Sequence, residues 1–212
     1  MDQNFAHFEA LCETLYGPDP NQAANFQQRR QPSHDERQRA DQELKNFTED
    51  VSNLGALKLY LEKSTSKFVQ FVAASALKQL FTQNWCKIPT AEKLSIKDFI
   101  IDFMVRKESS LDQQVIKMVI ILLAKITKMS WFDHPEIQGV VQNLFNLQTM
   151  NNERLTLLSW TALHDLIIEM SYVHKVRNLN VNRRISLSFR DGQLFAVFKQ
   201  SLQHVELLIN QI

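Results

Sequence analysis

The sequence predicts an all-α protein, a right-handed α-solenoid of about four to five antiparallel helix pairs of the HEAT type. Three observations lead to this fold class. Glycine occurs only four times in 212 residues, whereas tight hairpins usually need glycine for turns with positive φ. Apolar residues make up 44% of the chain and recur at helical spacings of three and four residues. The second helices of successive pairs start near residues 67, 110 and 152, and this period of 43 and then 42 residues is typical of HEAT and armadillo repeats.

The N-terminal part of the chain is expected to hold two helices separated by a loop. Apolar spacing predicts the first helix over residues 5–16. Residues 17–34 contain three of the five prolines and few aliphatic side chains, so they are expected to form a loop or insertion. A helix is predicted to restart near Ser33 or Asp35, because Ser33 followed three residues later by Glu36 is a capping-box pattern.

Three helix pairs follow, and each pair is joined by only a few residues, so its helices must be antiparallel neighbours. The predicted pairs are 54–64 with 67–85, 91–107 with 110–129, and 135–149 with 152–172. The polar, basic stretch 174–183 is expected to be a loop between repeats, and one or two last helices run from about residue 184.

The predicted helix 110–129 contains seven consecutive apolar residues, "MVIILLA", between Lys117 and Lys125. Because a membrane-spanning helix needs about 20 apolar residues, we interpret this run as a buried helix. One mostly polar stripe of this helix is predicted to face solvent and to line the concave side of the solenoid; it consists of Gln114, Lys117, Ile121, Lys125 and Lys128. The alternative for this helix is the centre of a globular helical bundle.

The sequence shows no pattern typical of an enzyme, so we predict no catalytic, metal-binding or cofactor-binding residues. The six histidines and two cysteines have no metal-ligand spacing, and no glycine-rich phosphate loop or nucleophile elbow occurs. His164 and Asp165 are adjacent, but we interpret them as positions on a helix surface or interface rather than as a catalytic pair. The formal net charge of +1 gives no overall attraction to nucleic acid.

Two further segments have alternative interpretations. In "WFDHPE" we expect Asp133 to cap a helix that begins at Pro135, with Trp131 and Phe132 closing the junction between two repeats. The basic run "RRISLSFRDG" (183–192) could bind nucleic acid, or Ser186 could be a site for a basophilic kinase, but we favour a solvated or partner-binding loop.

Several segments resemble the importin-β (karyopherin) family. "QFVAASALKQLFTQNW" (70–85), followed by "IPTAEKLSIKDFIIDFM" (88–104), is similar to the N-terminal domain that this family shares. "AKITKMSWFD" (124–133) and "ISLSFRDGQLFAVFKQSL" (185–202) resemble its exportin-seven branch. The resemblance covers residues 5–16 and 36–205, so residues 1–212 are expected to form an importin-β-like N-terminal HEAT-repeat domain, as a fragment of a longer receptor.

The resemblance implies a nuclear transport receptor of the exportin type, which shuttles between nucleus and cytoplasm through the nuclear pore complex. Such receptors bind the GTP form of the small GTPase Ran through inner helices, enclose cargo proteins, and dock Phe-Gly nucleoporins between outer helices. No membrane or direct nucleic-acid partner is implied. The Ran-facing candidates are Lys78, Gln114, Lys117, Lys125, Asp165 and Glu169. The alternative function is a generic HEAT-repeat interaction scaffold unrelated to nuclear transport.

Overall fold

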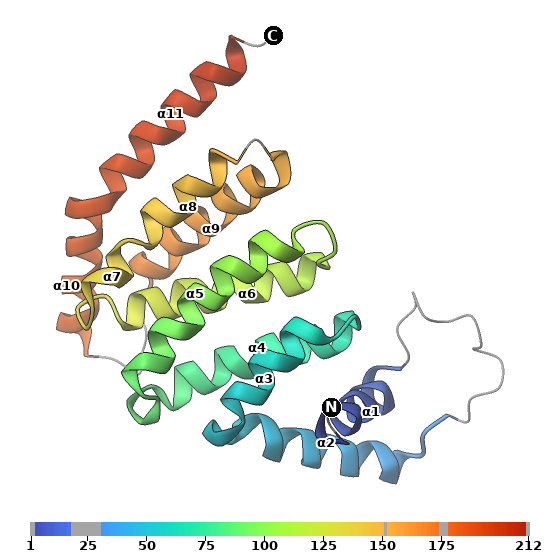
Figure 1. The fold of residues 1–212 in the computed structure, drawn as a ribbon. Coiled ribbons are helices and arrows are strands. Elements are labelled where there is room, and N and C mark those ends of the chain that lie inside the picture. Colours follow the sequence, from blue (N-terminus) through green and yellow to red (C-terminus); the bar gives the residue numbers. More distant parts are fainter. Residues whose placement is uncertain (1–2, 18–30, 151, 174–177, 211–212) are drawn as a thin grey trace. The chain divides into compact units, whose positions relative to one another are not determined.

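The computed structural model describes residues 3–17, 31–150, 152–173 and 178–210. In these ranges the chain forms helices and no strands (Figure 1), which confirms the predicted all-α class. The chain divides into two compact units, Met1–Glu92 with Ser110–Leu122 and Lys93–Ser109 with Leu123–Ile212. The curvature and handedness of the solenoid stay predictions.

The described residues of unit 1 form four whole helices, two short 3-10 turns and parts of two helices that it shares with unit 2. The helices are α1 (Gln3–Tyr16), α2 (His34–Glu49), α3 (Leu54–Lys63) and α4 (Lys67–Gln83), and the 3-10 turns are Val51–Asn53 and Trp85–Lys87. The start of α2 confirms the predicted capping box, because the Glu36 N–H donates to the Ser33 hydroxyl and the Ser33 N–H donates to the Glu36 carboxylate. Most of the expected loop 17–34 lies outside the described residues, in 18–30.

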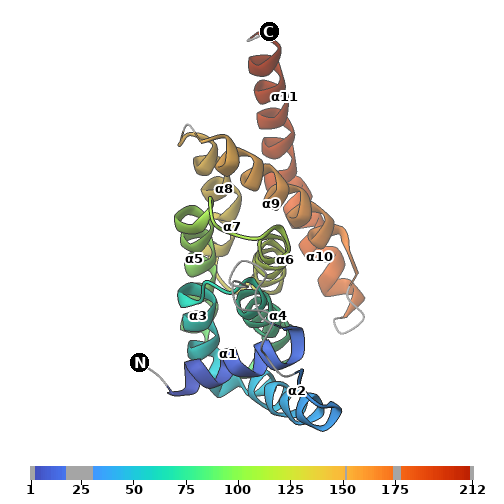
Figure 2. The same cartoon turned by 90° about the vertical axis from the view of Figure 1, so that its right-hand side faces the viewer.

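The core of unit 1 joins α1 to the predicted antiparallel pair of α3 and α4. Tyr60 of α3 packs against the rings of Phe5 and Phe8, at centroid distances of 5.2 and 4.9 Å. Ser64, in the short turn between α3 and α4, donates to the Glu9 carboxylate at 2.8 Å, and its carbonyl accepts from the Gln70 side chain at 2.9 Å. These contacts give the hydroxyl and the carbonyl of the buried Ser64 hydrogen-bond partners, since a buried polar group without a partner would destabilise the fold. Figure 2 shows α3 and α4 running side by side.

Unit 2 contains the remaining helices and parts of two helices that it shares with unit 1. Its elements are α5 (Thr90–Lys107), α6 (Gln113–Met129), α7 (Pro135–Gln138), α8 (Val140–Gln148), α9 (Glu153–Ser171), α10 (Leu179–Phe189), a π-helical segment (Arg190–Leu194) and α11 (Phe195–Ile209). The division between units passes through α5 and α6, so residues 90–92 and 113–122 of these helices belong to unit 1. The predicted antiparallel pair after residue 135 is confirmed, because α8 packs against α9.

Helix boundaries in unit 2 differ from the predictions where a local cap decides them. Helix α6 begins at Gln113 rather than at residue 110, because the Asp112 carboxylate accepts from the N–H of Gln114 at 2.8 Å. The segment 135–149 was predicted as one helix, but it is interrupted at Gly139, between α7 and α8.

The predicted cap at Asp133 is wrong. The residue before α7 is His134, whose side chain makes no capping hydrogen bond, while the Asp133 N–H donates to the Ser130 carbonyl at 2.8 Å. The helix start itself is confirmed, since Pro135 occupies its first turn and needs no partner for a missing N–H.

The junction after α6 is closed by one of the two aromatic residues predicted for it. Trp131 is buried, donates its Nε1–H to the Ser188 hydroxyl at 3.0 Å and meets the Phe189 ring edge-on at 5.6 Å. Phe132 is half exposed instead, with the Arg184 guanidinium 5.4 Å from its ring centroid. Its predicted role in closing the junction is therefore wrong.

The expected loop 174–183 is helical from Leu179 onward, while 174–177 lie outside the described residues. The Asn178 side chain caps α10 by accepting from the Asn180 N–H, and the helix buries Ile185 and Phe189 one turn apart. The loop predicted over 183–192 is therefore wrong as well. Ser186 lies within α10, half-buried, with its hydroxyl 2.6 Å from the Met170 carbonyl, so it is a poor kinase site.

The predicted polar stripe of α6 is confirmed at one end only. Gln114 and Lys117 are exposed, Lys125 is half-buried, and Lys128 is fully buried. The Lys128 ammonium donates to the backbone carbonyls of Glu169, at 2.6 Å, and of Tyr172. Lys128 therefore supplies a donor to carbonyls at the C-terminal end of α9. Carbonyls at a helix C-terminus generally lack intrahelical partners, and the helix dipole there favours a cation.

We expect Lys128→Met to destabilise the protein by about 1–3 kcal/mol, because carbonyls at the end of α9 lose a charged donor. Urea unfolding followed by circular dichroism measures this change. Lys117→Met on the same helix is the matched control, since Lys117 is exposed and its replacement should change stability by less than about 0.5 kcal/mol. Equal stability of the two variants would contradict the capping role.

The two cysteines are expected to differ in reactivity. Burial, reinforced by the nearby Glu9 carboxylate, raises the pKa of the Cys12 thiol to about 12, whereas Cys86 is exposed. At pH 8 only about one Cys12 thiol in ten thousand would be ionised, and the thiolate is the nucleophile. Native protein treated with iodoacetamide should therefore gain one label, at Cys86, and Cys86→Ser should gain none until denaturant is added. Two labels at similar rates in native protein would contradict this.

Candidate functional site

The six predicted site residues lie on three helices and in both units. Lys78 of α4 and Gln114 and Lys117 of α6 belong to unit 1, whereas Lys125 of α6 and Asp165 and Glu169 of α9 belong to unit 2.

The unit 1 candidates occupy the polar edges of helices that are otherwise buried. Helix α4 buries Ala73, Ala74 and Leu77 and leaves Lys78 half-buried at the edge of this apolar surface. A lysine in such a position packs its methylene stem on apolar neighbours and extends its ammonium toward solvent. On α6, Lys117 lies one turn after the capped first turn and is exposed. Both lysines can therefore meet an acidic partner surface at little cost in desolvation.

The unit 2 candidates contact one another. The Lys125 ammonium lies 3.6 Å from the Glu169 carboxylate, and the two side chains are only 18% and 13% exposed. Asp165 lies one helical turn before Glu169 and interacts with the His164 ring at 3.0 Å. Lys128, which the sequence predicts as a solvent-facing residue of α6, instead caps the same end of α9 through backbone carbonyls. The Lys125–Glu169 pair therefore fixes α9 against the end of α6 and leaves less of its charge for a partner.

A groove between α5 and α8 has a volume of about 440 Å³. Its lining residues are Asp98, Ile101, Asp102, Val105, Arg106, Asn143, Asn146, Leu147 and Met150. The buried or half-buried apolar side chains of Ile101, Val105 and Leu147 can take up an apolar group. The two asparagines can donate to and accept from a peptide main chain.

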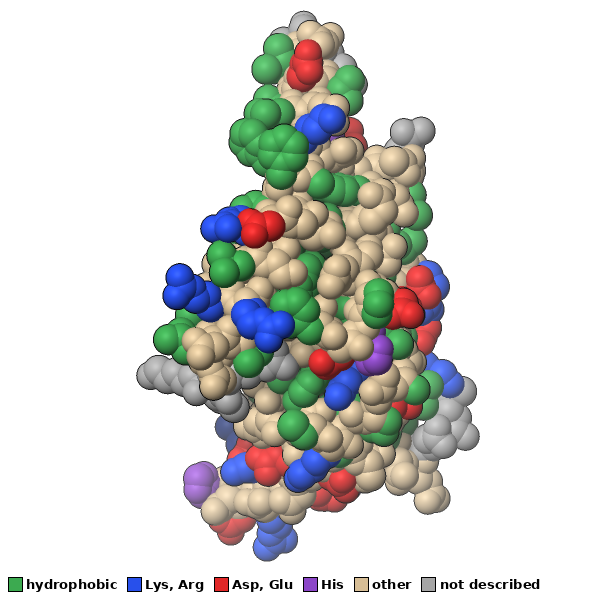
Figure 3. Space-filling model, turned by 90° about the vertical axis from the view of Figure 1, so that its left-hand side faces the viewer, with side chains coloured by type: hydrophobic (Ala, Val, Ile, Leu, Met, Phe, Trp, Pro, Cys, Tyr) green, Lys and Arg blue, Asp and Glu red, His purple; other side chains and the backbone are tan. Residues whose placement is uncertain are grey.

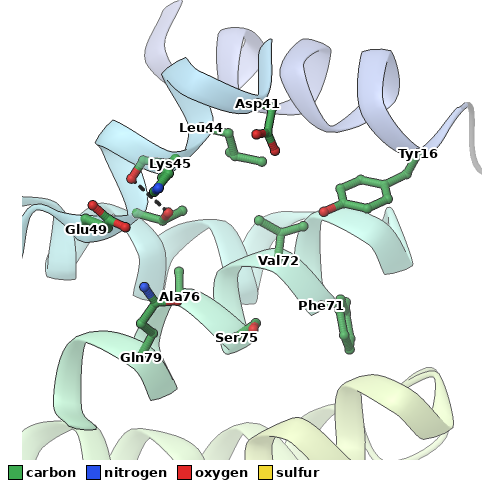
Figure 4. Close-up of a pocket in the computed structure, with 11 residues that line it drawn as sticks. Tyr16, Asp41, Leu44, Lys45, Glu49, Phe71, Val72, Ser75, Ala76 and Gln79 are labelled. Carbon is green, nitrogen blue, oxygen red and sulfur yellow. Dashed lines mark hydrogen bonds between the residues drawn. The ribbon is translucent and has the colours of Figure 1, made fainter. Parts of the chain in front are cut away.

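A second groove, of about 290 Å³, lies in unit 1 between α2 and α4 and is closed at one end by Tyr16 (Figure 4). Leu44 and Val72 form apolar walls, and the Asp41 carboxylate lies on the α2 side. Burial raises the pKa of the Tyr16 phenol, and the nearby Cys12 and Asp41 raise it further. Tyr16 therefore stays neutral and can donate a hydrogen bond. This groove can accept one apolar side chain beside a hydrogen-bonding group.

No spacing rule in a single sequence would have found either groove. Their walls come from helices about 30 to 45 residues apart in the chain, and the lining residues carry no motif. One sequence feature is compatible with a groove wall: an apolar residue directly beside a polar one in a helix, as at Ile101 and Asp102.

Among the described residues, no group of three or more His, Cys, Asp or Glu side chains is arranged to hold a metal ion. No described helix combines the length and the apolar character that crossing a membrane requires, which agrees with the interpretation of "MVIILLA" as part of a buried helix.

Comparison with known proteins agrees with the resemblance predicted from the sequence. The chain is 26% identical over 202 residues to Exportin-7-B of Xenopus laevis, an alignment that covers 94% of this chain and 17% of that protein. It is 28% identical over 199 residues to Ran-binding protein 17 of Homo sapiens, covering 91% and 16%. It is also 28% identical over 198 residues to Ran-binding protein 16 of Drosophila melanogaster, covering 90% and 16%.

The chain thus spans about one sixth of the length of these relatives. Residues 40–106, from the middle of α2 to the end of α5, match the family described as the importin-beta N-terminal domain. The family match thus covers about a third of the chain, and the similarity to Exportin-7-B and to Ran-binding proteins 16 and 17 extends along nine-tenths of it.

Proposed function

We propose that this chain forms part of a nuclear transport receptor of the exportin type, which binds the GTP form of Ran and contributes to cargo and Phe-Gly nucleoporin binding. The observation that carries the proposal is similarity over nine-tenths of the chain to Exportin-7-B and to two proteins whose names state Ran binding. The role is one of binding rather than catalysis, in a protein that shuttles between nucleus and cytoplasm through the nuclear pore complex.

Lys78, Gln114 and Lys117 are the preferred Ran-facing residues. Lys117 and Gln114 are exposed on α6, and Lys78 lies at the edge of the apolar surface of α4. Asp165, Lys125 and Glu169 are proposed as a supporting set. The charges of Lys125 and Glu169 already interact with each other at 3.6 Å, so they are less available to a partner. The supporting set would act by holding α9 and the end of α6 in position.

We expect the chain to retain Ran loaded with GTP and to retain little Ran loaded with GDP, and Lys117→Glu to lower the retained Ran-GTP about tenfold. Reversal of one charge in a contact surface replaces an attraction by a repulsion, which weakens association and changes its dependence on salt. The measurement is a pulldown with immobilised 212-residue chain, repeated at two salt concentrations.

Lys63→Glu is the matched control, because Lys63 is an exposed lysine of unit 1 outside the candidate set. It changes the net charge by the same amount and should leave Ran-GTP retention within about twofold. Equal retention of the GTP and GDP forms would argue for the generic HEAT-repeat scaffold instead. An equal loss in both variants would reject Lys117 as a contact residue.

The groove between α5 and α8 is the proposed Phe-Gly site. Its volume of about 440 Å³ is large enough for a phenyl ring, and the asparagines beside Ile101 and Leu147 can bind the adjoining glycine main chain. The glycine that follows the phenylalanine would let the peptide backbone approach these amides closely.

We expect Ile101→Asn to weaken binding of a Phe-Gly peptide about tenfold, because the phenyl ring loses an apolar wall. Titration of a fluorescent Phe-Gly repeat peptide measures the affinity, with a Ser-Gly peptide as the ligand control. Leu187→Asn on α10 is the protein control, since it removes an equally apolar but exposed side chain elsewhere in unit 2. Unchanged affinity in Ile101→Asn, with helical content preserved, would exclude this groove.

A further inference from the structure

The groove between α2 and α4 in unit 1 combines an apolar floor with a polar rim. Its floor consists of Leu44, Val72 and Ala76, which are all buried. Its volume of about 290 Å³ lies just below the range of roughly 300 to 1,000 Å³ typical of small-molecule sites, so it suits one inserted aliphatic side chain. The Tyr16 ring closes one end of the groove and stacks on the Phe68 ring at 5.9 Å.

The rim on the α2 side carries charges in the order negative, positive, negative. Asp41, Lys45 and Glu49 follow one another at intervals of four residues, so they lie along one side of α2, and all three are exposed. Within the described ranges of the chain, no ion pair engages any of them. The two carboxylates are therefore available to cations of a partner.

The rim on the α4 side offers hydrogen-bonding groups without charge. Ser75 and Gln79 lie one turn apart on α4, and both are half-buried. A side-chain amide and a hydroxyl can each donate and accept, so these two residues can bind the main chain of a peptide that lies along the groove. The charges that select a partner are thus confined to the α2 wall.

The spacing of the two carboxylates defines the segment that fits. Asp41 and Glu49 are eight positions apart on α2, which corresponds to about 12 Å along the helix. In an extended peptide, the side chains at the first and fifth positions lie on one face about 13 Å apart, with the third side chain between them. Cations at the two end positions can therefore reach both carboxylates while an aliphatic side chain at the central position enters the groove beside Leu44.

Lys45 and Tyr16 sharpen this selection. Lys45 lies midway between the two carboxylates, so it repels a cation at the central position of the peptide. The Tyr16 hydroxyl lies at the same end of the groove as Asp41 and can accept from a cation bound there (Figure 4). Arginine suits such a position, because its guanidinium presents several N–H groups in one plane.

The charge around α2 as a whole does not select a basic partner. Figure 3 shows acidic and basic side chains mixed at the lower end of the face that it draws, the end where α2 lies in Figure 1. Selection must therefore come from the positions of the charges along the groove rather than from their sum.

We propose that the groove between α2 and α4 binds an extended segment of a partner protein in which a leucine-sized aliphatic residue is flanked, two positions away on each side, by arginine. The two arginines pair with Asp41 and Glu49, and the aliphatic side chain packs on the apolar floor. This site goes beyond the proposed transport function and does not depend on it, because none of its described residues is a Ran-facing or Phe-Gly-binding candidate.

Titration of the fluorescein-labelled peptide Gly-Arg-Ser-Leu-Ser-Arg-Gly with the 212-residue chain, followed by fluorescence anisotropy, tests the proposal. We expect saturable binding with a dissociation constant below about 1 mM. Replacement of the leucine by serine should weaken binding about tenfold, because the groove floor loses its apolar partner. The rearranged peptide Gly-Ser-Leu-Ser-Arg-Arg-Gly has the same composition but can reach only one carboxylate, so it should bind about fivefold more weakly.

Charge changes on the rim test the same site from the side of the protein. Asp41→Lys and Glu49→Lys should each weaken binding of the first peptide about tenfold, whereas Lys45→Gln should strengthen it about threefold, because a repulsion is removed. Glu92→Lys is the matched control: Glu92 is an exposed carboxylate of unit 1 outside the groove, so its reversal should change the affinity by less than about twofold.

All four substituted residues are exposed, so circular dichroism should show unchanged helical content. Binding that does not saturate, equal affinity for the three peptides, or an equal effect of the three charge reversals would each overturn the proposal. Weaker binding by Lys45→Gln would overturn the assigned order of charges along the peptide.

Discussion

Helix α4 has more apolar surface than one neighbour can cover, since α1, α2 and α3 all pack against it, and this constraint organises unit 1. Helix α4 buries nine side chains, among them Ala73, Ala74 and Ala76, which allow neighbouring helices to approach closely. Such a helix is stable only between other helices, which is why the fold is a series of packed pairs. What remains for solvent is a narrow polar edge, and the proposed contact residues Lys78 and Lys117 lie on such edges.

The helical spacing of a lysine does not by itself predict whether its side chain is exposed. Lys117 and Lys128 lie in the same predicted stripe of α6, yet one is exposed and the other is fully buried. The difference lies in α9, whose last carbonyls reach Lys128 from residues 41 and 44 positions later in the chain. A charge is retained in the interior there because the end of a helix supplies acceptors that no apolar side chain could satisfy.

The sequence predicts the helical class and the residues of most helices, because these depend on local spacing and on caps such as Ser33 with Glu36. It mispredicts features that depend on distant contacts. The loop expected over 174–183 is helical from Leu179 because Ile185 and Phe189 have a surface to pack against, and Phe132 is exposed because Trp131 already meets Phe189. The grooves were not predictable, since their walls come from separate helices.

The proposed contact surfaces differ in the kind of partner they can select. The groove between α5 and α8 combines an apolar base with amide groups, so it can hold one inserted side chain and bind the adjoining main chain. The lysines at the edges of α4 and α6 lie outside any such groove: Lys117 is exposed and Lys78 is half-buried, so they can select a partner only by its charge. Shape therefore sets the specificity of the groove, and charge sets that of the lysine edges.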